Sequence, residues 1–582
     1  MTRSVNTPLL GVVAGTLLLA TPLRAQDAPP EWTADAARAE LEATFAALDD
    51  DQRFDAAEAR LQTAFDEAVE HAKGRDRNVI GDVGAALRMV TQIKDLRASD
   101  RETVYPVLRA NPDLAATLAY LIKEPHDDPP RVYRVLTRLC QARPKDVGRY
   151  PALVAAICVV HDDTFSTGAT GPLTDKPNAI RVFEHLVSRR SQLVFDLNDL
   201  PAELLVHMVD TGVGQGEVDW AFDKNAGDRN VGKRYHDVPY DTRYFKMGAD
   251  KRIASHTYTL DNIRRHGGVC SDQAYYASTI GKAIGVPTVM VSGRASEVGH
   301  CWVGFVRDRG GRLSWDFEEG RYDDFEDVRG RVKDPQTGRT ISDDEVAMRA
   351  DLARTPLKDR LLARALLDEA ERRRDPAAKV ELLEEAARLC PANIDVWRAA
   401  AGVAGEMSAT DRRRWAEALD GYCGTRYPTF TMTILRPLIE SVPDAREQTR
   451  LWSWAHTRFS RQDDLACEIL ISQASMWERD GSKAKAYDGY VHAGTRYINV
   501  SSEALDALKR AETMLTRNKR PELVLGLYAD AWRRVKRPSQ VSDTFIRGTN
   551  WYRIGTRYAM ELQKAGRESE AQGVLKRIGT IE

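Results

Sequence analysis

The pattern of the sequence changes twice along the chain, and these changes limit the architectures that it can adopt. Residues 26–204 and 341–582 place apolar residues three and four positions apart in Ala-, Leu- and Glu-rich runs, which predicts amphipathic helices. Residues 205–340 instead carry short β-rich runs and aromatic-glycine turns around one helical stretch. A helix followed by a strand meander predicts an α+β domain. Because 582 residues are too many for one hydrophobic core, we expect three domains that meet at these changes.

The first 25 residues differ from the rest of the chain. Arg3 precedes the apolar run PLLGVVAGTLLLATPL, and the polar stretch RAQDAPPEW follows it. This order is typical of a secretory signal peptide, with Ala25 before the cleavage point, and the run is too short to predict a stable membrane span. We therefore expect a secreted or periplasmic protein whose mature chain begins near Gln26. A disordered or buried N-terminal helix is the alternative.

Residues 341–582 predict a helical domain of repeat type. Its start, TISDDEVAMRADLAR, places Ser342 as N-cap and Glu345 three residues later, which is a capping box. The unit DPAAKVELLEEAARLCPANIDVWRAAAGVAGE has small residues at the spacing of paired helices and a proline just past a helix end. We expect a tetratricopeptide-like domain, with a plain α-helical domain as the alternative. Such repeats commonly bind a protein partner on their concave face.

Charge and motifs exclude several function classes. The net charge is −2 with 29% charged residues, so no basic surface for nucleic acid is predicted. The sequence contains no phosphate-binding loop and no nucleotide fingerprint, and His161, Asp162 and Asp163 are better interpreted as a solvated helix end than as metal ligands. We therefore expect neither a cofactor nor a metal. The seven cysteines are scattered and odd in number, so they do not predict a disulfide framework.

One cysteine stands where chemistry is favoured. The stretch GGVCSDQAYYASTIGKAIGVP, residues 267–287, predicts a helix that begins at Cys270 and ends before Gly-Val-Pro. At a helix N-terminus, unpaired N–H groups and the helix dipole favour a thiolate over a thiol. Gly267 and Gly268 lack Cβ atoms and would let a substrate approach the sulfur. A buried structural cysteine is the alternative interpretation.

A histidine and an acid follow at useful positions. His300 lies in VGHCWVGFV and Asp316 in RLSWDFEE, and these runs, with PTVMVSGRA before them, predict three strands, the second pair joined as a hairpin at DRGG. A thiol nucleophile needs an imidazole to exchange its proton, and the imidazole needs an acceptor on its other nitrogen. Helix, strand and adjacent strand would supply these three groups.

These motifs resemble the transglutaminase-like superfamily, a branch of the papain-like thiol enzymes. The matching elements, over about residues 205–335, are the helix start GGVC, the helix stop IGVP, the strand end VSG, the HCW strand and the SWDFE strand. The resemblance implies a papain-like core in which Cys270 is the nucleophile, His300 the general base and Asp316 the orienting acid.

The chain departs from the family pattern in two places. Cys301 replaces the usual Ala after the histidine, and because side chains alternate along a strand we expect it to face away from His300 and from Cys270. Asp316 follows the tryptophan directly, whereas the family acid usually follows a few residues later, so Glu318 on the same strand face is the alternative third member.

An oxyanion hole is also expected. The Cys270 N–H can supply one donor. Trp220 is a candidate for a side-chain donor, and a packed core aromatic is the alternative interpretation of that residue.

The resulting hypothesis is acyl transfer on peptide or glutamine amide bonds through a thioester. Water as acceptor would give hydrolysis and an amine would give a cross-link, and the sequence leaves both open. The alternative is an exported helical-repeat scaffold that binds a peptide or protein without turning it over.

Overall fold

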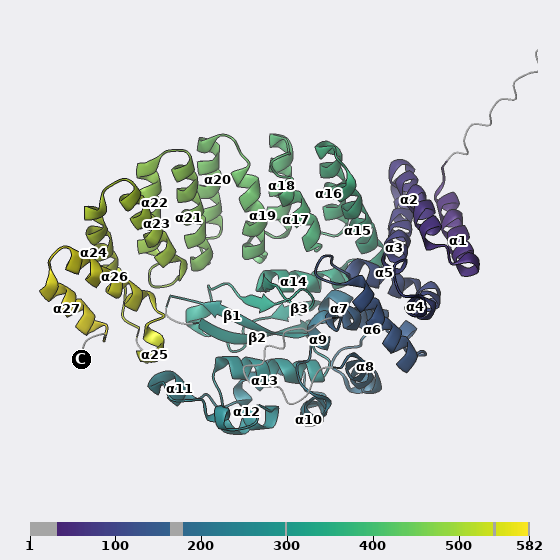
Figure 1. The fold of residues 1–582 in the computed structure, drawn as a ribbon, viewed down its shortest axis with the longest axis horizontal. Coiled ribbons are helices and arrows are strands. Elements are labelled where there is room, and N and C mark those ends of the chain that lie inside the picture. Colours follow the sequence, from purple (N-terminus) through teal and green to yellow (C-terminus); the bar gives the residue numbers. More distant parts are fainter. Residues whose placement is uncertain (1–31, 163–177, 297–298, 539–542, 580–582) are drawn as a thin grey trace, which may run out of the picture.

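The computed structural model describes residues 32–162, 178–296, 299–538 and 543–579. Within them, helices come first, a small antiparallel sheet with its own helices follows, and a long run of helices ends the chain (Figure 1). The α+β class with helical regions on both sides is therefore confirmed. The expected signal peptide, residues 1–25, lies outside the described residues and stays a prediction.

The N-terminal block is helical throughout its described part. The apolar helix α7 lies at its centre, with every residue from Leu153 to Val160 buried. The helices of this block are α1 (Ala34–Asp51), α2 (Phe54–His71), α3 (Asn78–Ile93), α4 (Ala98–Ala110), α5 (Pro112–Leu121), α6 (Pro129–Ala142), α7 (Pro151–Val160), α8 (Ala179–Ser188) and α9 (Ala202–Val209).

The middle block contains the sheet. Its strands are antiparallel and lie in the order β3-β2-β1-β4-β5. The elements are α10 (Gln215–Asn225), the 3-10 helix η4 (Val231–Asp237), α11 (Thr242–Met247), α12 (Leu260–His266), α13 (Cys270–Ala283), β1 (Thr288–Arg294), β2 (Gly299–Asp308), β3 (Leu313–Asp316), β4 (Arg331–Lys333), β5 (Thr340–Ser342) and α14 (Asp343–Asp351).

Turn residues set the local structure of this block as the sequence predicts. Gly285, with φ +82°, ends α13 and leads through Val-Pro into β1, because a left-handed residue after a helix suits glycine. Gly310 and Gly311, with φ +67° and +83°, form the turn between β2 and β3. Ser342 and Glu345 form the predicted capping box at the start of α14.

The sheet is packed between two helices. Ala274 and Ala277 of α13 share a buried cluster with Val303 and Phe305 of β2, so α13 covers one face. The opposite face packs Trp302 of β2 in a second cluster that includes α14. Side chains of β2 thus alternate between the two faces, as expected for a strand buried on both sides.

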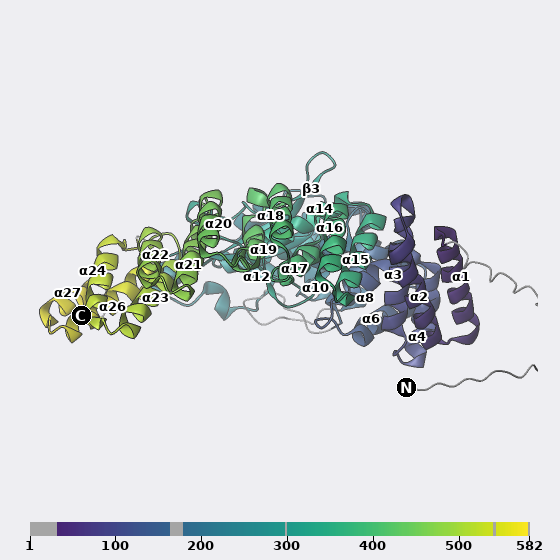
Figure 2. The same ribbon diagram turned by 90° about the horizontal axis from the view of Figure 1, so that it is seen from above.

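The C-terminal block is a run of helices, many of them packed against the next along the chain. Figure 1 shows these helices as an arc around one side of the sheet, and Figure 2, from above, shows the first and last helices of the molecule at opposite ends. They are α15 (Leu357–Arg372), α16 (Pro376–Leu389), α17 (Ile394–Gly402), α18 (Ala409–Tyr422), α19 (Pro428–Glu440), α20 (Ala445–Arg458), α21 (Asp463–Arg479), α22 (Lys483–Arg496), α23 (Glu503–Arg517), α24 (Val524–Arg534), α25 (Asp543–Ile546), α26 (Asn550–Lys564) and α27 (Glu568–Arg577).

The inner side of this arc holds the sheet block. Arg329, before β4, donates to Asp464 (Nε to Oδ2, 2.9 Å) and to Glu468 (Nη1 to Oε2, 2.5 Å) on α21. The Asp344 carboxylate of α14 accepts the backbone N–H groups of Thr429 and Phe430 at the start of α19, at 2.7 and 3.2 Å. The concave face on which we expected a partner is therefore occupied, at these places, by the chain's own middle block.

The three blocks do not have separate hydrophobic cores. One buried cluster joins helices α2 to α9 with Val306 of β2 and Ala350 of α14, and a second joins α1 to α3 with helices of the C-terminal arc. Buried packing therefore crosses the expected boundaries near residues 205 and 340. Across the described residues, no helix has both the length and the apolar character that a membrane crossing needs.

Candidate active site

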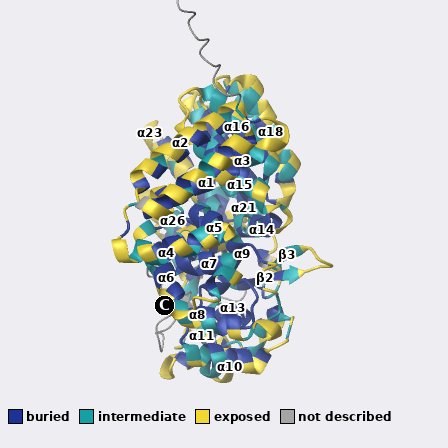
Figure 3. Ribbon diagram, turned by 90° about the vertical axis from the view of Figure 1, so that its right-hand side faces the viewer, coloured by how far each residue is buried: buried dark blue, intermediate teal, exposed yellow. Residues whose placement is uncertain are grey.

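Helix α13 is buried except at its first two residues, Cys270 and Ser271, which are half-buried. All of its residues after Ser271 are buried, and Figure 3 draws α13 largely in the colour of buried residues, whereas Cys270 is half-buried. The N–H groups of the first helical turn have no intrahelical acceptor, so those at Cys270 are suited to stabilise negative charge. The helix start predicted from the sequence is confirmed.

A buried carboxylate fixes the start of α13. Asp272 is fully buried, and it accepts the Val269 N–H (2.9 Å), the Tyr258 hydroxyl (2.9 Å) and the Lys251 ammonium (3.0 Å). These three hydrogen bonds tie the start of α13 to Val269, just before the helix, and to the segment that contains Lys251 and Tyr258. The sulfur therefore stands on a rigid support.

The two glycines before Cys270 allow close packing of the chain, whereas the sequence predicted that they give a substrate access to the sulfur. A Cβ on Gly268 would lie 2.4 Å from the Asp272 side chain, and one on Gly267, at φ +80°, would lie 2.4 Å from the Pro239 carbonyl oxygen. They allow the chain itself to pack closely at the helix start. The prediction that they admit a substrate is not needed to explain them.

His300 stands beside the sulfur at the start of β2. Its Nε2 lies 2.5 Å from the Gly320 carbonyl oxygen, and because a carbonyl only accepts, Nε2 carries the proton. Its ring stacks on Tyr322, with centroids 4.1 Å apart, and also contacts Phe325 at 4.9 Å. The His300 imidazole is close enough to the Cys270 sulfur to lower the pKa of that thiol, so the structure brings these two predicted site residues together.

Asp316 is not the group that orients His300, and this corrects the sequence prediction. Asp316 pairs with Phe305 across β2 and β3, five residues along β2 from His300, or about 16 Å at the rise of a strand. Its carboxylate instead lies 2.8 Å from the Arg307 guanidinium. Glu318, the alternative, has a side chain 74% exposed near Arg321, 3.9 Å away. The backbone carbonyl of Gly320 occupies the position expected for an acid.

The expectation for Cys301 holds for His300, from which it faces away, but is wrong for Cys270. Its side chain packs with the buried cluster of α13, and its thiol is close enough to that of Cys270 for each to shift the pKa of the other. Alternation along β2 does separate Cys301 from His300. Cys270, at the first residue of α13, is near the start of β2, and both His300 and Cys301 influence the pKa of its thiol.

These contacts make Cys270 the acidic thiol of the pair. The hydrogen bond from Cys301 is the largest cause that lowers the pKa of Cys270, and the hydrogen bond and charge of His300 lower it further against the effect of burial. The same bond, together with burial, raises the pKa of Cys301. Cys301 is thus the donor and Cys270 the thiolate.

Tyrosines surround this group, and the sequence analysis did not identify them. The Tyr235 hydroxyl donates to the Cys301 carbonyl oxygen at 2.9 Å. Burial and the nearby charge of Cys270 raise the pKa values of Tyr240 and Tyr322. Tyr322 is 46% exposed and covers the His300 ring. No sequence motif predicts them, because Tyr235 and Tyr240 lie before α13 and Tyr322 lies after β3, far from Cys270 in the sequence.

Trp220 does not lie in this group. It packs beside a buried cluster that contains Tyr275 and Ile280 of α13, so the packed-aromatic interpretation is confirmed. Gln273, one helical turn after Cys270, donates to the Val238 carbonyl oxygen at 2.9 Å. The backbone N–H of Cys270 remains the best-placed oxyanion donor.

Comparisons with known proteins do not identify a family for this chain. The chain matches no protein-family model and no curated protein. In the described part of the chain, no group of three or more His, Cys, Asp or Glu side chains is arranged to hold a metal ion.

Proposed function

We propose that this chain is a thiol-dependent acyl-transfer enzyme of the transglutaminase-like type, acting on peptide or glutamine amide bonds. The observation that carries the proposal is the proximity of Cys270 and His300 at the half-buried start of an otherwise buried helix, where the imidazole lowers the pKa of the thiol. Its support from the fold is the order of a helix that begins at the cysteine and an antiparallel strand that bears the histidine. The motifs GGVC and HCW, by which the sequence resembles the superfamily, carry these two residues.

The geometry suggests the following steps. The Cys270 thiolate attacks the amide carbon, and the developing oxyanion meets the N–H at the start of α13. The C–N bond then breaks, and the proton held by His300 passes to the leaving amine or ammonia, which leaves a thioester on Cys270. Water or a second amine attacks the thioester and transfers its proton to His300, which restores the free thiolate.

The Gly320 carbonyl gives His300 its tautomer. A proton on Nε2 leaves Nδ1 as the nitrogen that exchanges a proton with the sulfur and the substrate. A neutral carbonyl stabilises an imidazolium less than a carboxylate does. The low pKa of the thiol therefore depends more on Cys301 than in a site with a carboxylate.

The scaffold alternative has less support than the enzyme. Its concave binding face is in contact with the middle block through Arg329 and Asp344. A binder also has no need for an acidic thiol paired with an imidazole.

Selective alkylation tests the proposal directly. We expect iodoacetamide near neutral pH to modify Cys270 roughly 100-fold faster than Cys158, whose pKa burial raises well above its usual value. Peptide mapping over a time course measures both rates in one sample. A Cys270 no faster than Cys158 would reduce it to a structural residue and remove the basis of the proposal.

Cys301 should set the pH at which Cys270 reacts. Cys301→Ala removes the main donor to the thiolate, so the pKa of Cys270 should rise and the midpoint of its alkylation profile should move up by about one to two pH units. Cys301→Ser retains a donor and should shift the midpoint less. Cys423→Ala, which removes a buried thiol, is the control. An unchanged midpoint in Cys301→Ala would show that the two thiols do not interact in solution.

We also propose that the chain is exported, on the strength of the Arg3, apolar run and Ala25 order. The mature protein should begin near Gln26. N-terminal sequencing of the exported fraction measures this, and Met1 on most of that material would contradict it.

A further inference from the structure

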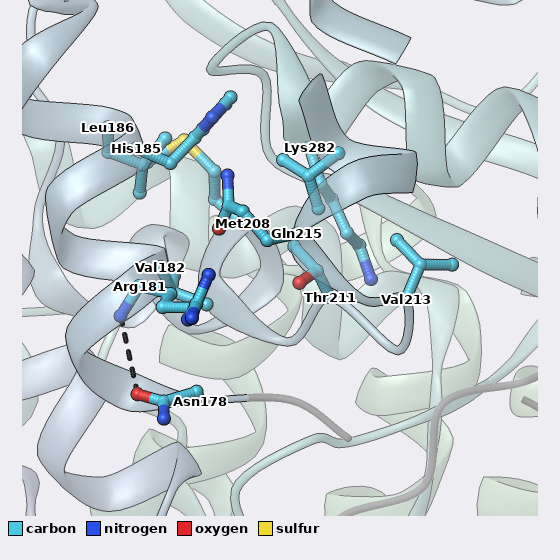
Figure 4. Close-up of a pocket in the computed structure, with 11 residues that line it drawn as sticks. Asn178, Arg181, Val182, His185, Leu186, Met208, Thr211, Val213, Gln215 and Lys282 are labelled. Carbon is cyan, nitrogen blue, oxygen red and sulfur yellow. Dashed lines mark hydrogen bonds between the residues drawn. The ribbon is translucent and has the colours of Figure 1, made fainter. Parts of the chain in front are cut away.

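A cavity lies at the C-terminal end of helix α13, at the opposite end from Cys270. Its volume is about 290 Å³, and it is bounded by α8, α9, α10 and the last turn of α13 (Figure 4). Lys282, in that last turn, is twelve residues from Cys270, or about 18 Å along the helix. The cavity is therefore separate from the candidate active site.

The side chains that line this cavity carry positive charge and no carboxylate. Arg181 of α8 and Lys282 of α13 are its charged members. Lys282 is 8% exposed, and its ammonium forms an ion pair at 2.6 Å with Asp210, which does not itself line the cavity. Arg181 is exposed and forms no ion pair with any described residue. His185 donates from Nε2 to the Ala283 carbonyl oxygen at 2.8 Å, and burial lowers its pKa, so it adds no charge.

An unsatisfied hydroxyl also faces this space. Thr211 is 6% exposed, and among the described residues its Oγ1 has no hydrogen-bond partner. It follows Asp210 directly, and Figure 4 draws it with Lys282 among the side chains that line the cavity. Buried polar atoms in native proteins are nearly always hydrogen-bonded, so this hydroxyl indicates a ligand or an ordered water. Leu186 and Met208 form an apolar wall in the same cavity.

We propose that this cavity binds a small carboxylate with a short apolar chain. The carboxylate would accept hydrogen bonds from Thr211 and Lys282, with Arg181 supplying further positive charge, and the chain would pack against Leu186 and Met208. The volume suits a molecule of a few carbon atoms, since pockets for drug-sized ligands run from about 300 Å³ upward. The site does not depend on the thiol chemistry of Cys270.

Isothermal titration calorimetry with isovalerate tests this site, with isovaleramide as the neutral analogue of the same shape and inorganic phosphate as an anion without an apolar chain. We expect isovalerate to bind the full-length protein at millimolar concentration and the other two to bind at least roughly tenfold more weakly. Isovaleramide should bind more weakly because a hydrogen bond to a charged group exceeds a neutral one, and phosphate because it has no apolar chain to pack against Leu186 and Met208. Equal binding of isovaleramide, tighter binding of phosphate, or no binding of isovalerate would overturn the proposal.

Variants locate the binding. Thr211→Val keeps the shape of the side chain, and Arg181→Gln changes an exposed residue, so both should fold; each should weaken isovalerate binding roughly tenfold. Lys224→Gln, an exposed cation elsewhere on α10, should bind as wild type. Cys270→Ala should also bind as wild type, which separates this proposal from the enzymatic one. Unchanged affinity in both Thr211→Val and Arg181→Gln would place the ligand elsewhere and refute the site.

Discussion

Cys270→Ala and His300→Ala should each reduce turnover of a glutamine-rich peptide pool by roughly 10³- to 10⁶-fold, because nucleophile and base act as one unit. Release of ammonia measures reaction at glutamine side chains, and the appearance of new amine termini measures cleavage of peptide bonds. Cys270→Ala should cost about 1 kcal/mol or less of folding free energy, since the side chain is small and partly exposed. Wild type treated with an electrophilic peptide should carry the adduct on Cys270 by mass spectrometry.

Asp316→Asn is the informative control for this experiment. Asp316 bonds Arg307 and lies about 16 Å along the sheet from His300, so the variant should keep turnover near that of wild type. A loss comparable to that of His300→Ala would return Asp316 to the catalytic role that the family resemblance implied. Full turnover in Cys270→Ala would refute the thioester route outright.

The largest effect on stability is expected at Arg329. Its guanidinium is mostly buried and bonds Asp464 and Glu468, so Arg329→Met leaves Asp464 without its cation, while Glu468 keeps Arg436. Breaking a buried ion pair from one side costs about 3–5 kcal/mol. Denaturant unfolding of the full chain should show a lower midpoint, and limited proteolysis should cut the C-terminal arc earlier than in wild type.

Two further variants separate charge from packing. Arg331→Met, an exposed arginine two residues away on β4, should change stability by about 0.5 kcal/mol or less. Adding Asp464→Asn to Arg329→Met removes one uncompensated charge and should recover part of the loss. A wild-type midpoint in Arg329→Met would mean that this cluster does not hold the arc to the sheet block.

The parts of the site that are local in sequence could be predicted. The start of α13 at Cys270 and the capping box of Ser342 and Glu345 depend on neighbouring residues, so the sequence shows them. The proximity of Cys270 to His300 was expected from the order of helix and strand. Each of these features depends on the identity of a few side chains, which the sequence gives directly.

The parts that could not be predicted depend on backbone atoms or on distant segments. The acceptor for His300 is the carbonyl oxygen of Gly320, and residue types do not reveal which carbonyl will lie there. Strand alternation separates Cys301 from His300 but does not say that the end of α13 contacts both. The arc around the sheet depends on pairs such as Arg329 with Asp464, 135 residues apart.

The connection that leads from β1 toward His300 has a consequence for the timing of activity during synthesis. The Ser296 hydroxyl donates to the Asn499 carbonyl oxygen at 2.5 Å, and the Ser296 carbonyl oxygen accepts the Asn550 N–H at 3.1 Å. A ribosome adds about 5–20 residues per second, so the later anchor follows Ser296 by roughly 10–50 s. During that interval the nascent chain already contains Cys270 and His300 but lacks the segment that holds the approach to His300. We therefore expect a chain released before Asn550 to lack this anchor, and full reactivity of Cys270 to appear only once synthesis is nearly complete.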